Sequence, residues 1–126
     1  MFVTAAYIAI FALLSLSIFQ LALTIGAPIG RFAWGGKHRT LPTHLRIASG
    51  LSLLLYAVFV AFICSKSGIA AVVTSAQVLN IGMWIFSAYF VTGIFMNAIS
   101  RSKPERYVMT PVASILAITF TIVTLS

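Results

Sequence analysis

Residues 26–43, with the sequence GAPIGRFAWGGKHRTLPT, form the longest polar interruption in an otherwise apolar chain. Four glycines and two prolines in this stretch rule out one continuous helix across it. Three basic residues alternate there with Phe32 and Trp34, a mixture typical of backbone that lies at a membrane–water interface. The stretch therefore predicts a connection at a membrane surface between two apolar segments.

The composition of the whole chain agrees with a membrane protein. Hydrophobic residues make up 61% of the 126 residues and charged residues 7%, whereas soluble domains are about half apolar and about a quarter charged. The length fits one domain. Most of the apolar surface must then face lipid or neighbouring helices, which excludes a soluble globular protein.

Four uncharged or nearly uncharged runs are long enough to span a bilayer. Residues 2–25 carry no charge, and at a rise of about 1.5 Å per residue they cover the ~30 Å hydrocarbon core. The same reasoning places further spans after the connection. The sequence predicts an all-α fold: an integral membrane bundle of four transmembrane helices at about 2–25, 43–64, 75–99 and 104–125, in a single domain.

Capping residues mark where three of these helices begin. A threonine between Thr40 and Thr43 is expected to cap the second helix, and Thr74 or Ser75 the third. Ser102 precedes Glu105 by three residues, the spacing of a capping box at the start of the fourth helix. Glu105 is the only acidic residue, and we expect it to cap this helix and to neutralise basic neighbours.

Four amide side chains fall within the predicted spans and are candidate intramembrane polar residues: Gln20, Gln77, Asn80 and Asn97. Polar groups in lipid need partners, so they should point into the bundle. Gln20 and Asn97 lie near the same side of the membrane and are expected to hydrogen-bond across the first and third helices. The alternative is that these amides line a path for a solute.

Two stripes of small residues at helical spacing predict close helix contacts. One, in the second helix, consists of Gly50, Ala57, Ala61 and Cys64. The other, in the fourth helix, consists of Thr110, Ser114, Ala117, Thr121 and Thr124.

The basic residues predict the orientation. Seven of the eight lie in residues 31–46 and 101–106, and only Lys66 lies between the second and third helices. The positive-inside rule then places the first and third connections in the cytoplasm and both termini outside it. The net charge of +7 is explained by this topology, so no nucleic-acid partner is expected. The candidate contacts with anionic lipid headgroups or a protein partner are Arg31, Trp34, Lys37, Arg39, Arg46, Arg101, Lys103 and Arg106.

Residues that carry chemistry are scarce. Arg46, Glu105 and Arg106 lie at the ends of their predicted spans, and no Lys, Arg, Asp or Glu lies at membrane depth, although proton-coupled transporters usually need one there. His38 and His44 have no carboxylate or second cysteine nearby to complete a metal site. The run GRFAWGGKHR lacks the spacing of a phosphate-binding loop. We therefore expect no enzyme activity, no metal and no cofactor; a lipid-headgroup site in this run stays open.

The segments GAPIGRFAWGGKHRTLPTHLRIAS and MNAISRSKPERYVMTPVA resemble those of a family of small, uncharacterised four-helix bacterial inner-membrane proteins. They cover both basic connections and the adjoining helix ends. The resemblance implies the four-helix topology and a bacterial inner (cytoplasmic) membrane, and it implies no activity.

Two functions fit these observations. The first is a structural or accessory membrane protein whose basic cytoplasmic face contacts lipid or a protein partner. The alternative is a homo-oligomeric small channel or transporter for an ion or small solute, lined by the amide and threonine faces.

Overall fold

The computed structural model describes residues 2–126, which form four long helices and no strand. The helices are α1 (Phe2–Thr24), α2 (Thr43–Ser67), α3 (Ala76–Ala98) and α4 (Lys103–Thr124), and two short 3-10 turns, η1 (Gly30–Phe32) and η2 (Trp34–Gly36), lie between α1 and α2. Each long helix is long and apolar enough to cross a membrane. The predicted all-α bundle is confirmed, with helix ends within three residues of those expected.

Serine hydroxyls cap two of the helices as predicted. Ser75 Oγ accepts the N–H of Val78 at 3.3 Å, and Ser102 Oγ accepts the N–H of Glu105 at 3.4 Å. The prediction that a threonine caps α2 is wrong. Pro42 occupies the capping position in an extended conformation (φ −66°, ψ 163°), and its carbonyl accepts the first helical N–H groups without help from a side chain.

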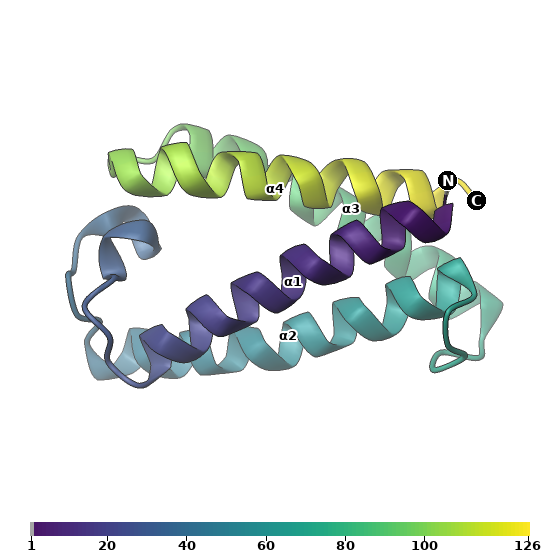
Figure 1. Cartoon of the computed structure of the whole chain (residues 1–126), viewed down its shortest axis with the longest axis horizontal. Coiled ribbons are helices and arrows are strands. Elements are labelled where there is room, and N and C mark those ends of the chain that lie inside the picture. The colour runs from purple at the N-terminus through teal and green to yellow at the C-terminus, as the bar shows by residue number, and fades with distance from the viewer. Residues whose placement is uncertain (1) are drawn as a thin grey trace.

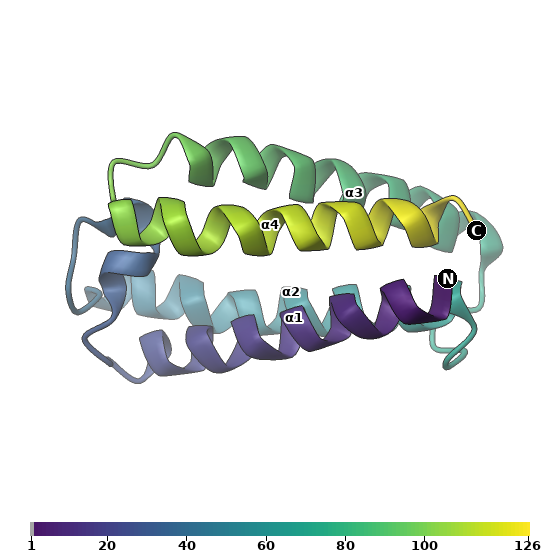
Figure 2. The same ribbon diagram turned by 45° about the horizontal axis from the view of Figure 1, so that its top comes forward.

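The helices form two antiparallel hairpins, α1–α2 and α3–α4 (Figures 1 and 2). The chain termini lie at the same end of the bundle as the α2–α3 connection, here called the terminal end. The other two connections, residues 25–42 and 99–102, lie at the opposite end, here called the basic end (Figure 1). The two basic connections therefore share one end of the bundle, as the predicted topology requires.

An aromatic cluster joins the hairpins. Phe59 of α2 is 1% exposed, and its ring centroid lies 4.7 Å from that of Phe86, 4.9 Å from that of Phe90 and 6.1 Å from that of Phe120. These separations fall in the range of favourable tilted and edge-to-face ring pairs. The buried residues of α1 in this core are three alanines and Leu13, and Ile10 and Leu16 pack against it partly buried.

The prediction of close helix contacts holds to different extents for the two small-residue stripes. In α2 only part of the stripe makes a helix contact. A side-chain carbon on Gly50 would lie 3.5 Å from Thr24 Cγ2 of α1, but Ala57 is exposed and the buried positions are Ser49, Phe59 and Ile63. In α4 the stripe is partly buried: Ala117 is 4% exposed, and Thr124 Oγ1 lies 3.1 Å from Ser87 Oγ of α3.

Candidate functional site

The first basic connection is a folded segment with its own small core. Leu23, Ala33 and Leu41 are buried together beneath it. The Gly30 N–H donates to the Arg39 carbonyl at 2.8 Å, and a side-chain carbon on Gly30 would collide with the backbone of residues 38 and 39. Only glycine fits where these two backbone segments approach each other so closely.

This connection is hydrogen-bonded to the start of α4. Ser102 Oγ donates a hydrogen bond to the Arg31 carbonyl while it accepts the Glu105 N–H. Gly36 (φ 71°) lies so close to Ser102 that a side chain on Gly36 would overlap it. We call this contact between residues 31–36 and Ser102 the latch; it joins the first basic connection to the start of α4.

Two of the predicted surface contacts, Arg46 and Trp34, form hydrogen bonds within the first hairpin. Arg46 Nε donates to the Thr24 carbonyl at 2.9 Å, which satisfies a free carbonyl at the end of α1. Trp34, which has a positive φ of 52°, donates from Nε1 to the buried Ser49 Oγ at 3.0 Å. Trp34 nevertheless stays 43% exposed.

The other predicted basic residues surround this end of the bundle. Most are exposed, and Arg106 is half-buried. Arg31 lies over the Phe32 ring and Arg106 over the Tyr107 ring, with the guanidinium carbon 5.1 Å and 5.0 Å from the ring centroids. The exposed members are Arg31, Lys37, Arg39, Arg101 and Lys103.

A cavity of about 560 Å³ lies between the hairpins at the basic end. Figure 1 shows α1 close to α4 at the terminal end and drawing away from it toward the basic end. All four helices and the η1–η2 segment contribute to the walls, which are mostly apolar. The side chains among them that carry polar groups are Gln20, Trp34, Ser52, Tyr56, Tyr89, Thr92, Asn97, Ser100 and Glu105.

The hydrogen bonds in this cavity differ from those predicted. Gln20 Nε2 donates to the Tyr56 hydroxyl at 3.2 Å, and Asn97 Nδ2 donates to the Gly93 carbonyl of its own helix at 2.9 Å. The predicted bond between Gln20 and Asn97 is therefore wrong, although both line the same cavity. Gln20 Oε1 is buried and has no partner among residues 2–126.

The carboxylate of Glu105 also has an unexpected partner. It accepts the Ser100 hydroxyl at 3.0 Å, rather than the Ser102 N–H that a complete capping box would use. That N–H instead bonds to Ser100 Oγ at 3.2 Å. The prediction that Glu105 caps α4 is therefore wrong: Ser102 caps the Glu105 N–H, and the Glu105 side chain lies in the cavity wall.

The remaining two predicted amides lie at the terminal end. Gln77 and Asn80 are both exposed, and Asn80 Oδ1 accepts a hydrogen bond from Lys66 Nζ at 2.7 Å. The four amides therefore form two separate pairs at opposite ends. They do not line one continuous face inside this chain.

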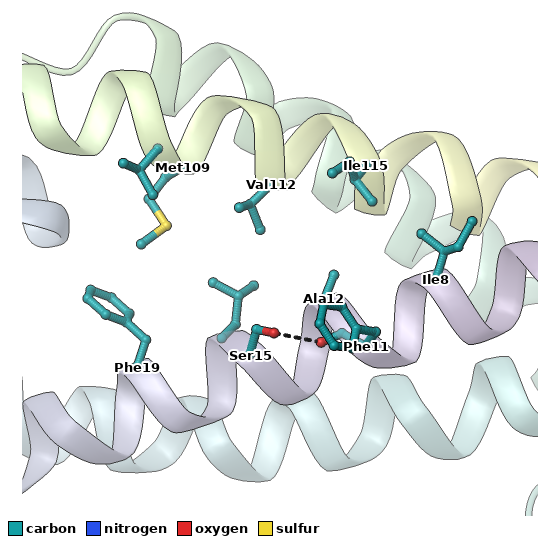
Figure 3. Close-up of a pocket in the computed structure, with 10 residues that line it drawn as sticks. Ile8, Phe11, Ala12, Ser15, Phe19, Met109, Val112 and Ile115 are labelled. Atoms are coloured by element: carbon teal, nitrogen blue, oxygen red, sulfur yellow. Dashed lines mark hydrogen bonds between the residues drawn. The ribbon is translucent and has the colours of Figure 1, made fainter.

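A second hollow opens sideways between α1 and α4. It has a volume of about 350 Å³ and almost wholly apolar walls, with Phe11, Phe19, Met109 and Val112 facing one another across it (Figure 3). Phe19, Met109 and Val112 also line the cavity. We call this hollow the groove; it opens at the outer surface of the bundle and lies next to the cavity.

Sequence reasoning missed the aromatic and sulfur-containing walls of both hollows. Tyr56 and Tyr89 line the cavity, and Met109 lines both hollows. Tyr56 did carry a signal, because a tyrosine hydroxyl inside an apolar span needs a hydrogen-bond partner. Its partner, Gln20, lies 36 positions away, so no local pattern reveals the pair.

Across residues 2–126, no three His, Cys, Asp or Glu side chains gather closely enough to hold a metal ion. No protein-family model, curated protein or solved structure matches this chain.

Proposed function

We propose that this multi-pass membrane protein has a structural or accessory role without catalytic chemistry, and that its basic end contacts anionic lipid headgroups or a protein partner. The observation that carries the proposal is the gathering of five exposed basic residues from two separate connections at one end of the bundle. Each Lys or Arg near an anionic membrane surface contributes about 1 kcal/mol of attraction. The latch holds the two connections together, so their charges act on one surface.

The same charges support an orientation with the basic end in the cytoplasm and both termini outside it. The resemblance of residues 26–49 and 96–113 to bacterial inner-membrane proteins supports a bacterial cytoplasmic membrane as the location. Cysteine labelling from outside the cell, in a Cys64→Ser background, tests the orientation. A cysteine at Ala70 should react, whereas cysteines at Lys37 and Lys103 should not; all three positions are exposed. The opposite pattern would overturn the orientation.

Lipid preference tests the role of the basic end. The triple variant Arg31→Gln, Lys37→Gln, Arg39→Gln should bind anionic lipid less strongly, by up to about 3 kcal/mol in low salt. The difference from the parent should shrink in physiological salt, where charges are screened over ~8 Å. Quenching of Trp34 by brominated phosphatidylglycerol and by brominated phosphatidylcholine, in a Trp84→Phe background, reports the preference.

A matched control for that experiment is Lys66→Gln, because Lys66 lies at the terminal end and bonds to Asn80. It should leave the preference for anionic lipid around Trp34 unchanged. An unchanged preference in the triple variant as well would remove lipid contact from the proposal and favour a protein partner.

The second candidate function, a homo-oligomeric small channel or transporter, is favoured by one observation. The cavity carries the polar side chains of Gln20 and Asn97 at membrane depth near the basic end. Flux of a panel of ions into proteoliposomes, compared between the parent and a Gln20→Leu, Asn97→Leu variant, tests this function. Flux that depends on both residues would replace the accessory role.

A further inference from the structure

We propose that the cavity and the groove together form one binding site for a single-chain amphiphile whose head donates hydrogen bonds. The alkyl chain would lie in the groove between α1 and α4, and the head would lie in the cavity beside Gln20 and Glu105. The proposal rests on the placement of the chain in a membrane but not on lipid contacts of the basic end.

The shape of the site supports a small occupant. The cavity of about 560 Å³ and the groove of about 350 Å³ fall in the range of about 300–1,000 Å³ that is usual for small-molecule sites. Shared walls, among them Phe19 and Met109, place the two hollows next to each other. The groove opens between exposed side chains such as Phe11, which is 75% exposed, so a chain can enter sideways from lipid.

The polar groups of the cavity select the head. Gln20 Oε1 is a buried acceptor without a partner among the described residues, and such a group costs about 1–3 kcal/mol until a donor reaches it. Asn97 Nδ2 donates to a backbone carbonyl, which can only accept, so Oδ1 is the atom of this amide left to accept. Glu105 adds a carboxyl group, and an ionised carboxylate can accept hydrogen bonds but cannot donate them.

The head is therefore a donor, and two kinds of molecule supply one: a long-chain amine and a long-chain alcohol or diol. A head that only accepts, such as a sulfate, can bond to the hydroxyl groups of the cavity, but it would leave Gln20 Oε1 without a donor. It would also place a second negative charge next to the carboxylate.

Binding is measured in nanodiscs of phosphatidylcholine, whose headgroup has no hydrogen-bond donor. The probes are an alkylamine, a 1-alkylglycerol and an alkyl sulfate with equal chains, each brominated on the chain. Trp34 lines the cavity, so its quenching in a Trp84→Phe background reports occupancy. Trp84 is 55% exposed on α3, and in a Trp34→Phe background it reports simple partition into lipid.

We expect saturable quenching of Trp34 by the amine and the alkylglycerol, with half-saturation at about tenfold lower concentration than for the sulfate. Trp84 should show no saturable phase. Saturation by the sulfate at an equal or lower concentration would overturn the proposal. Absence of any saturable phase would mean that water alone fills the site, and would overturn it too.

Four variants assign the two parts of the site. Gln20→Leu should raise half-saturation for both donor probes, whereas Gln77→Leu, which removes an exposed amide at the terminal end, should not. Glu105→Gln should weaken the binding of the amine more than the binding of the alkylglycerol. Ala12→Phe should fill the groove and weaken the binding of all three probes without changing the polar groups. If Gln20→Leu and Ala12→Phe both bind like the parent, the proposal is wrong.

These variants leave every basic residue in place. The preference of the basic end for anionic lipid should therefore persist in all four. Loss of probe binding with that preference intact separates a failure of this site from a failure of the proposed function.

Discussion

Phe59→Ala tests which forces hold the two hairpins together. Phe59 is 1% exposed and lies in the middle of three rings from α3 and α4, with centroid separations of 4.7, 4.9 and 6.1 Å. The substitution removes these ring contacts and leaves a cavity in the part of the bundle where α2, α3 and α4 meet.

The magnitude follows from the membrane setting. In a water-soluble core the same substitution costs about 3–5 kcal/mol, of which about 1.5–3 kcal/mol is the transfer of the ring out of water. That part is lost in a bilayer, because lipid tails are as apolar as the bundle interior. The remaining cost, from the cavity and from ring pairs worth about 0.5–1.5 kcal/mol each, is about 2 kcal/mol. The ratio of folded to unfolded molecules should fall about thirtyfold.

The measurement is reversible unfolding in mixed micelles with an increasing fraction of dodecyl sulfate, followed by tryptophan fluorescence. The matched control is Phe95→Ala, which removes the same ring from a lipid-facing position of α3 that is 67% exposed. It should change the free energy of unfolding by less than about 0.5 kcal/mol. Equal destabilisation by the two variants would refute the packing argument.

Two further stability predictions rest on local contacts. Ala117→Leu should cost about 1–3 kcal/mol by overpacking, because Ala117 is 4% exposed, whereas Ile118→Leu at a position 59% exposed should be tolerated; equal unfolding curves would contradict this. Ser102→Ala should cost more than Ser75→Ala, since both remove a cap worth about 1 kcal/mol but only Ser102 also forms the latch. Hydrogen exchange of the η1 and η2 amides should accelerate in Ser102→Ala alone, and unchanged protection there would show that the latch does not hold the connection.

The sequence alone determined those features that depend on neighbours along the chain. The four spans follow from the lengths of the apolar runs. The caps at Ser75 and Ser102 depend on N–H groups only three residues ahead. Once four antiparallel spans are established, the two basic connections must share one end of the bundle.

Only the tertiary structure decided which apolar face meets which. In lipid, the side chains that face the membrane are as apolar as those that face the core, so α2 shows no pattern that buries Phe59 and exposes Ala57. The partner of Gln20 is likewise set by the crossing of α1 and α2, which brings Tyr56 within 3.2 Å and leaves Asn97 to its own helix. The cavity exists because the distance between α1 and α4 increases toward the basic end. That divergence depends on contacts between helices that are distant in sequence, and no local sequence pattern encodes it.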